Sequence, residues 1–148
     1  MAGSDRPDRP EAERFKRVRE AHQTELAEDY VELIGDLIAE TGEARVVDLA
    51  ERLGVSSATV NNSIQRLQRD GLVTSKPYRA IFLTERGQEM AAVARERHRV
   101  VVELLIALGV DAATAEVDAE GIEHHVSDVT LSAFRVFLDK QSAQNRKR

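Results

Sequence analysis

Hydrophobic residues recur at intervals of three and four positions over most of the chain, which is the spacing of one face of an α-helix. The clearest run predicts a first helix from about Arg14 to Gly42. Two short apolar segments, 72–75 and 80–83, flank a turn and predict a β-hairpin. Glycine and capping signals add helices over 46–53, 56–70, 84–108, 111–126 with a break near Gly121, and 128–140. The pattern therefore predicts a mainly α-helical protein with one small hairpin.

The second and third predicted helices have the spacing of a helix-turn-helix. Ala50 is small enough for two helices to cross closely, and Gly54 allows the sharp turn between them. With the hairpin as a wing, this is a winged helix-turn-helix, in which the second helix reads base edges and the wing touches the DNA backbone. The candidate DNA-binding residues are Ser57, Thr59, Asn61, Asn62, Gln65, Arg66, Arg69, Lys76 and Arg79.

The distribution of charge favours this interpretation, although the total charge does not. The 148 residues carry a net charge of −5, which alone argues against a nucleic-acid partner. Residues 45–79, however, contain six basic and three acidic side chains, whereas residues 1–44 contain six basic and twelve acidic ones. One basic segment beside acidic flanks favours DNA binding by a single surface. The alternative is a winged helix that contacts another protein and whose arginines face solvent.

Composition excludes several other classes of protein. The chain has no cysteine, which excludes disulfides, thiolate metal sites and cysteine nucleophiles. Aromatic residues make up only 4%, which argues against a stacking surface for single-stranded nucleic acid. No apolar run reaches the length of a membrane span and no signal-peptide pattern opens the chain. We therefore expect a cytoplasmic protein without a membrane partner.

Carboxylate and imidazole side chains occur in three segments at spacings that suit a metal site. Asp29 and Glu32 are three positions apart, so they share one face of the first predicted helix. His98 lies on the apolar stripe of the long helix after the hairpin. The third segment supplies Glu120, Glu123 and His124. Each group alone is compatible with a solvated or structural role, but oxygen and nitrogen donors without sulfur suit manganese or ferrous iron, with zinc also accepted.

These segments resemble the diphtheria toxin repressor (DtxR/MntR) family over about residues 21–140. The resemblance is carried by Asp29-Tyr30-Val31-Glu32, the helix-turn-helix through Gly71, the pair Arg97-His98 and, most specifically, Glu120-Gly121-Ile122-Glu123-His124-His125. It implies that the metal ligands are Asp29, Glu32, His98, Glu120, Glu123 and His124. The iron-sensing branch has methionine at the position of Asp29 and cysteine at that of Glu123, so the carboxylates found here favour the manganese branch.

One departure from the family pattern concerns the number of metal ions. Manganese-type members often have a glutamate four residues after the helix histidine, where it serves a second ion, and this chain has Val102. Glu103 is adjacent, but one residue turns a side chain by about 100° around a helix. Val102 therefore argues for one tightly bound manganese ion per chain, with any second ion bound weakly.

The predicted organisation has four parts: a flexible tail over 1–20, a winged helix-turn-helix over 21–84, a helical metal-binding and dimerisation domain over 85–140, and a basic flexible tail over 141–148. The apolar C-terminal helices suggest a symmetric homodimer. The resemblance implies repression of manganese uptake through a palindromic operator in double-stranded DNA. It also implies Mn²⁺ as the activating ion, with Fe²⁺ as an alternative and Zn²⁺, Co²⁺ or Cd²⁺ as substitutes.

Two other functions stay open at this point. One is a winged-helix regulator that senses iron or another ligand. If that ligand is organic, the acidic cluster serves only the structure. The other is a metallohydrolase, which would need an open coordination position beside a substrate cleft. The sequence shows no nucleophile or substrate-binding motif, so we expect a protein that is not an enzyme.

Overall fold

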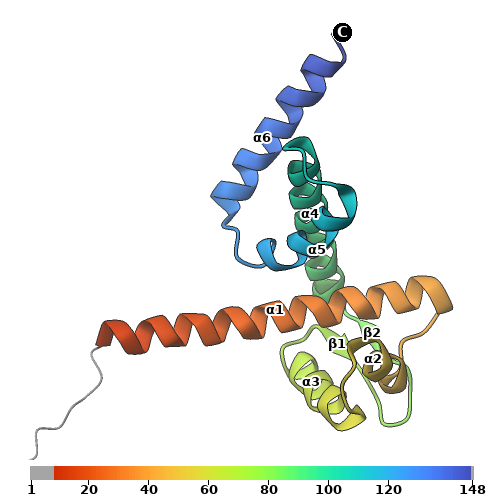
Figure 1. The fold of residues 1–148 in the computed structure, drawn as a ribbon. Coiled ribbons are helices and arrows are strands. Elements are labelled where there is room, and N and C mark those ends of the chain that lie inside the picture. The colour runs from red at the N-terminus through yellow and green to blue at the C-terminus, as the bar shows by residue number, and fades with distance from the viewer. Residues whose placement is uncertain (1–8, 148) are drawn as a thin grey trace, which may run out of the picture.

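The computed structural model describes residues 9–147 and is built almost entirely of helices (Figure 1). In chain order the elements are α1 (Arg9–Thr41), α2 (Val46–Leu53), α3 (Ser57–Arg69), β1 (Val73–Thr74), β2 (Phe82–Leu83), α4 (Glu85–Ala107), α5 (Ala112–Ile122) and α6 (Asp128–Asn145). The two strands pair antiparallel, with Val73 opposite Leu83. These elements confirm the prediction of a mainly helical chain with one small hairpin. None of the described helices is both long enough and apolar enough to cross a membrane.

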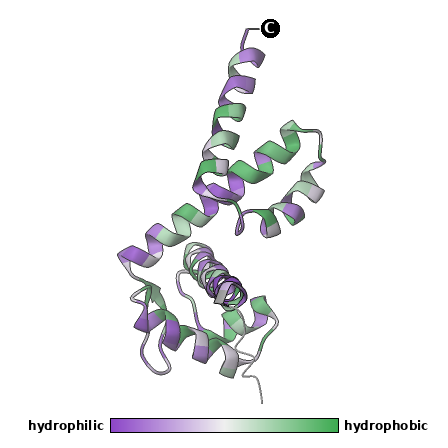
Figure 2. Ribbon diagram, turned by 90° about the vertical axis from the view of Figure 1, so that its left-hand side faces the viewer, coloured by the Kyte–Doolittle hydropathy of each residue, from purple (hydrophilic) through white to green (hydrophobic). Residues whose placement is uncertain are grey.

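Two hydrophobic cores hold these elements together. The first surrounds Ile34, Leu49 and Ile81 and joins α1 to α2, α3 and the hairpin. The second surrounds Val101 and Leu131 and joins the C-terminal part of α4 to α5 and α6. Helix α4 starts at the hairpin, packs across α1 and ends in the second core (Figure 1). Viewed nearly along its axis in Figure 2, α1 lies between the two groups of elements, so residues on α1 can face both.

Helix α1 begins at Arg9, earlier than the sequence predicted, so residues 9–20 are helical and not an irregular tail. Residues 10–20 are exposed and rich in the helix formers Glu, Ala, Arg and Lys. Lys16 Nζ lies 3.8 Å from Glu20 Oε1, one turn further along the helix. Local propensity and side-chain pairing therefore favour this part of the helix without tertiary packing. The rest of the predicted tail, residues 1–8, lies outside the described residues.

The end of α5 agrees with the predicted break near Gly121, whereas α6 ends later than predicted. Helix α5 ends at Ile122, one residue after Gly121, and residues 123–125 form a turn where the prediction continued the helix to 126. Ala115 and Ala119 are buried in the second core and hold α5 there. Helix α6 passes the predicted end at Lys140 and continues to Asn145, so much of the predicted tail 141–148 is helical.

The capping signals in the sequence place the starts of α3 and α4 correctly. The Ser56 hydroxyl accepts a hydrogen bond from the Thr59 N–H at 3.1 Å, and the Thr84 hydroxyl accepts one from the Gly87 N–H at 3.1 Å. Between α2 and α3, Gly54 has a φ of 65°, a left-handed conformation that glycine adopts without strain. These local features set the angle at which α3 leaves the turn.

Gly87 is needed for a different reason, because its backbone is helical but closely packed. A Cβ atom at this position would overlap the carbonyl oxygen of Leu72. That oxygen also accepts a hydrogen bond from the Thr84 N–H at 3.0 Å, so the two segments cannot separate without breaking the junction.

We expect Gly87→Ala to lower the free energy of unfolding by about 1–3 kcal/mol through overpacking. Urea denaturation of the metal-free protein measures this change. Gly121→Ala is the matched control, because it is also a helical glycine and an added Cβ there meets nothing within 4 Å. The control should be neutral or stabilising by up to about 1 kcal/mol. Equal losses in the two variants would contradict the packing argument.

Candidate metal centre and nucleic-acid interface

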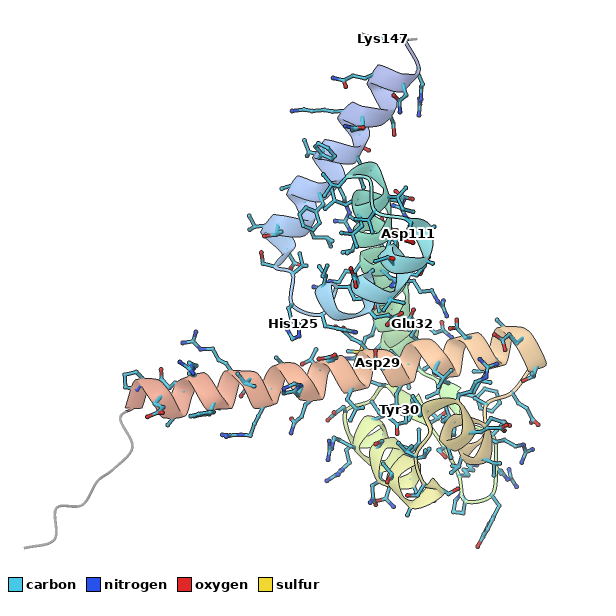
Figure 3. All side chains as sticks on the ribbon, viewed as in Figure 1. Asp29, Tyr30, Glu32, Asp111, His125 and Lys147 are labelled. Carbon is cyan, nitrogen blue, oxygen red and sulfur yellow. The ribbon has the colours of Figure 1, made fainter. Side chains whose placement is uncertain are left out.

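The predicted metal ligands come from three elements that meet where α1 crosses α4 and the end of α5. Asp29 and Glu32 project from the middle of α1 toward the second group of helices (Figure 3). His98 belongs to α4. Glu120 lies near the end of α5, and Glu123 and His124 lie in the turn that follows it. The fold thus brings together residues that are far apart in the sequence.

His98 is surrounded by carboxylates of the α5 segment. Its Nδ1 lies 2.6 Å from Glu123 Oε2 and 3.7 Å from Glu120 Oε1, and the three residues offer ligand atoms within 4.8 Å of one another. Its other nitrogen, Nε2, lies 2.6 Å from Glu116 Oε2. One nitrogen therefore faces the predicted ligands, while the other is held by a carboxylate outside the predicted set.

His124 has the same arrangement and connects the two groups of elements. Its Nε2 lies 3.3 Å from Asp29 Oδ1 in α1 and 3.5 Å from Glu123 Oε1. Its Nδ1 lies 2.9 Å from Glu28 Oε2, also in α1. The side chains of His124 and Glu123 are each only 3% exposed, so these contacts are shielded from water.

Five of the six predicted ligands are linked by these contacts: Asp29, His98, Glu120, Glu123 and His124. Glu32 makes no hydrogen bond or ion pair with them among the described residues, but the charges of Glu120 and His98 act on its pKa. The sequence analysis missed Glu28 and Glu116. Glu116 precedes Glu120 by one helical turn, so helical spacing was a usable signal for it.

Burial and crowding shift the titration of this cluster. Burial raises the pKa of Glu123 to about 7, in spite of the opposing effect of His98. Burial also raises the pKa of Asp29 and of Glu32. For His98, burial alone would lower the pKa, but hydrogen bonding to Glu116 and Glu123 outweighs it and the pKa is raised. His124 behaves in the same way, with Glu28 as the main opposing partner.

The donor set fits a divalent cation of the manganese type. It offers carboxylate oxygens and imidazole nitrogens and no sulfur, which suits Mn²⁺ and Fe²⁺. Carboxylates with raised pKa values repel one another when ionised, and a bound cation would relieve that repulsion. The second nitrogen of each imidazole is held by a carboxylate, Glu28 or Glu116, which is the arrangement that orients histidine ligands in metal sites.

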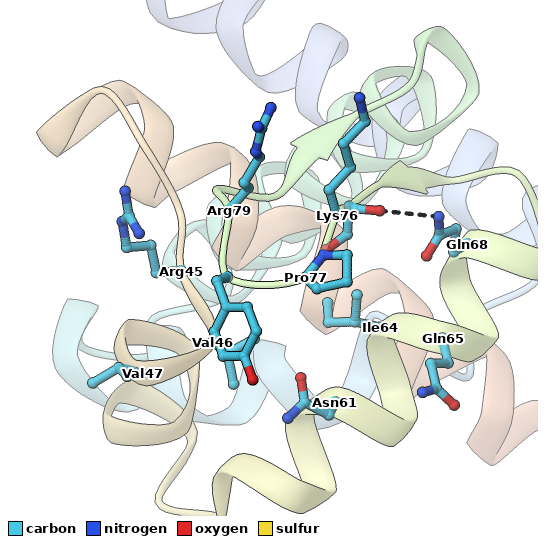
Figure 4. Close-up of a pocket in the computed structure, with 12 residues that line it drawn as sticks. Arg45, Val46, Val47, Asn61, Ile64, Gln65, Gln68, Lys76, Pro77 and Arg79 are labelled. Atoms are coloured by element: carbon cyan, nitrogen blue, oxygen red, sulfur yellow. Dashed lines mark hydrogen bonds between the residues drawn. The ribbon is translucent and has the colours of Figure 1, made fainter.

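The predicted DNA-binding residues fall into a groove and its surroundings. A groove of about 590 Å³ lies between α3, the start of α2 and the hairpin. Asn61 and Gln65 face it from α3, and Lys76 and Arg79 stand on the hairpin side (Figure 4). Gln68 Nε2 donates to the Ser75 carbonyl oxygen at 3.2 Å, which ties the hairpin to α3.

The other predicted DNA-binding residues lie outside this groove, although all are exposed: Ser57, Thr59, Asn62, Arg66 and Arg69. The Thr59 hydroxyl is 2.9 Å from the Ser56 hydroxyl, so it takes part in capping α3. Arg66 borders a small pocket between α3 and α1. Arg69 borders an open hollow beside Gln65 and Gln68.

Two residues near the groove were missed by the sequence analysis. Arg45 lines the groove beside the start of α2. Tyr78 is fully exposed at the hairpin tip and has a φ of 60°, an uncommon conformation for a residue with a bulky side chain. The fully exposed Tyr78 side chain adds a ring and a hydroxyl group to the surface that the hairpin presents beside Lys76 and Arg79.

Comparison with known proteins gives a consistent result for both halves of the chain. Residues 22–81 match the family model "Iron dependent repressor, N-terminal DNA binding domain", and residues 84–145 match "Iron dependent repressor, metal binding and dimerisation domain". The transcriptional regulator MntR of Escherichia coli O157:H7 is 54% identical over 132 residues, covering 89% of this chain and 85% of that protein. The regulator of the same name from Lysinibacillus sphaericus is 39% identical over 104 residues, covering 70% and 75%.

A solved structure described as a manganese-dependent transcriptional repressor in complex with manganese is also similar. It has a TM-score of 0.69 and 32% sequence identity over 76% of this chain. The chain spans about half the length of that structure, 52%.

The pKa shifts predict how the metal-free protein responds to pH. Asp29, Glu32 and Glu123 have raised pKa values in the folded state, so folding favours their protonated forms and stability is lost as pH rises through the folded values. His98 and His124 also have raised values, so their stabilising protonated forms are lost as pH rises above about 6.5.

All five groups act in the same direction, and we expect the free energy of unfolding in chelator to fall between about pH 5 and pH 8. Glu123→Gln should remove roughly 1–3 kcal/mol of this fall. Urea denaturation at fixed protein concentration measures it. A stability that rises with pH over this interval would contradict the assigned environment of Glu123.

Proposed function

The chain belongs to the DtxR/MntR family of metal-responsive, DNA-binding transcriptional regulators, and from this premise we propose that it represses manganese-uptake genes when Mn²⁺ is bound. The observation that carries the proposal is the division of the ligands between α1 and the turn after α5. In the predicted organisation α1 belongs to the DNA-binding domain, 21–84, and the turn to the dimerisation domain, 85–140. Because both domains supply ligands, occupation of the site by a metal ion would fix the position of one domain relative to the other.

The residues that would hold the ion are Asp29, Glu32, His98, Glu120, Glu123 and His124. When bound, the ion supplies positive charge and directional coordination. Glu28 holds His124 so that Nε2 faces Asp29 and Glu123, and Glu116 holds His98 so that Nδ1 faces Glu123. These two carboxylates orient the imidazoles before an ion arrives, which lowers the entropic cost of binding.

Mn²⁺ is the ion that these donors and the named relatives favour. Carboxylates at Asp29 and Glu123 supply hard oxygen donors. Fe²⁺ has similar preferences and is the alternative activating ion, while Zn²⁺, Co²⁺ and Cd²⁺ bind the same donor types and would act as substitutes.

Exposed apolar residues on the second group of helices supply a surface for a second copy of the chain. They include Leu108, Val117, Val129 and Val136, which are 53–82% exposed. A symmetric dimer that covers this surface would carry two α3 helices at the spacing of successive major grooves on a palindromic operator. The family is one of transcriptional repressors, so we propose a cytoplasmic regulator with no enzymatic activity.

DNA binding with and without metal tests this proposal directly. A duplex selected from a random library by the manganese-loaded protein serves as the operator. We expect Mn²⁺ to tighten binding by about 10- to 100-fold relative to chelator, as in typical allosteric coupling, measured by fluorescence anisotropy. Equal affinity in Mn²⁺ and chelator would contradict metal-responsive regulation.

The same assay separates the roles of groove residues. Asn61→Ala should weaken binding to the selected duplex by about tenfold and leave a scrambled duplex unaffected, because base contacts carry specificity. Arg79→Ala should weaken binding to both duplexes and flatten the salt dependence, because a phosphate contact is lost. If both variants behave alike on both duplexes, α3 does not read bases.

The surroundings of Val102 predict one tightly bound Mn²⁺ per chain. Val102 is only 8% exposed and has no donor atom. Glu103 is exposed, and its Oε1 lies 2.8 Å from Arg99 Nη1, so it is paired on the outer face of α4. Calorimetry and elemental analysis after desalting measure the stoichiometry. Two ions of comparable affinity per chain would show that other donors replace the missing carboxylate.

A further inference from the structure

Two of the four histidines in the chain have no role in the metal centre described above. They are His22, in the exposed part of α1, and His125, which directly follows His124. Figure 3 shows His125 beside α1, on the side toward its N-terminal half. Although these histidines are far apart in the sequence, both side chains come close to the same carboxylate, that of Glu25.

Glu25 Oε2 is the common point of this group. It lies 3.9 Å from His22 Nδ1 and 3.9 Å from His125 Nε2. Both separations exceed hydrogen-bond length, and neither imidazole makes another hydrogen bond or ion pair among residues 9–147. The side chains of His22 and His125 are 70% and 62% exposed, while that of Glu25 is 29% exposed. The ring nitrogens are therefore accessible to an ion from solvent.

We propose that His22, Glu25 and His125 form a second metal site, selective for Zn²⁺ over Mn²⁺. Two imidazoles and one carboxylate are a common zinc ligand set, and a water molecule supplies the fourth ligand. A tetrahedral zinc ion with bonds of about 2.0–2.1 Å holds its donors roughly 3.4 Å apart, so each His–Glu separation needs to shorten by about half an ångström. The two imidazole nitrogens that face Glu25 lie more than 4.8 Å apart and need to approach by a larger amount. Both imidazoles are mostly exposed, so rotation of their side chains is the movement that would bring the three donors together.

The two sites differ in the ions they prefer because their donors differ. The first centre is dominated by carboxylates, which suit Mn²⁺, whereas the second is dominated by imidazoles, which favour zinc along with cobalt and nickel. His22 and Glu25 are three positions apart on α1, a spacing that places both on one face of the helix. The site thus lies N-terminal to Asp29 on the same helix.

The consequence is a second link between the same two parts of the structure. His22 and Glu25 belong to α1, and His125 belongs to the turn between α5 and α6. An ion held by all three fixes that turn against α1 whether or not the first centre is filled. This site neither requires nor supplies the manganese response, so the two proposals can fail separately.

The test measures zinc binding by the full chain without an affinity tag. Glu123→Gln combined with His98→Ala disables the first centre. We expect this variant still to bind one Zn²⁺ per chain in competition with a weak chelator, and to give the visible absorption band of four-coordinate cobalt when Co²⁺ replaces zinc. Adding His22→Ala and His125→Ala should abolish both signals, whereas adding Gln23→Ala, on the same exposed helix, should leave both unchanged.

A second arm uses the first centre intact, so that the result does not depend on the folding of the disabled variant. His22→Ala with His125→Ala alone should lose one Zn²⁺ per chain and keep the Mn²⁺ stoichiometry and the manganese response in DNA binding. An unchanged zinc count in this variant, or no zinc bound by the disabled variant while circular dichroism shows it folded, would overturn the proposal.

Discussion

The buried imidazole of His124 joins α1 to the turn after α5. Its Nδ1 faces Glu28 and its Nε2 faces Asp29, both on α1, and Nε2 also faces Glu123 in its own turn. Helix α1 is part of the first core, and the turn continues from α5 in the second. In the proposed function, a change in charge or coordination at this ring would therefore act on the position of the winged helix relative to α4, α5 and α6.

In the proposed function, the same cluster links stability to regulation. Glu123 lies between the two histidines with a side chain only 3% exposed, and burial raises its pKa to about 7, so its ionised form is costly in the metal-free fold. Protons can neutralise the cluster at low pH, and a divalent cation can do so at neutral pH. The proposed ion would bind the folded chain and require deprotonated ligands, so metal binding would stabilise the fold. The crowding of carboxylates that destabilises the ionised, metal-free centre would then also be what favours cation binding.

Much of the fold could be predicted from local signals. The caps at Ser56 and Thr84 and the turn at Gly54 depend on a few neighbouring residues, so the sequence alone indicated them correctly. The early start of α1 was missed because a charged, exposed helix has no apolar stripe to reveal it. The end of α5 one residue after Gly121 agrees with the glycine signal. The extension of α6 beyond Lys140 was missed because its last turn is polar and exposed and has no apolar stripe.

The candidate metal centre was predictable only in part. The family pattern pointed to residues that the structure brings together. Glu116 could have been found from its one-turn spacing to Glu120, but Glu28 acts through the orientation of the His124 ring, which no spacing rule states. The sequence also did not indicate Arg45 and Tyr78. They line the groove only because the hairpin folds back toward the start of α2. Long-range geometry, rather than residue type, decided these positions.

In the proposed function, one ion ties α1 to the turn after α5 and leaves the recognition helix α3 itself unchanged. Amide hydrogen exchange of the metal-free and the manganese-loaded protein tests this most directly. We expect slower exchange in residues 25–32 and 119–126 on addition of Mn²⁺, with little change within 57–69. Unchanged exchange in those two segments, under conditions where Mn²⁺ tightens DNA binding, would contradict it.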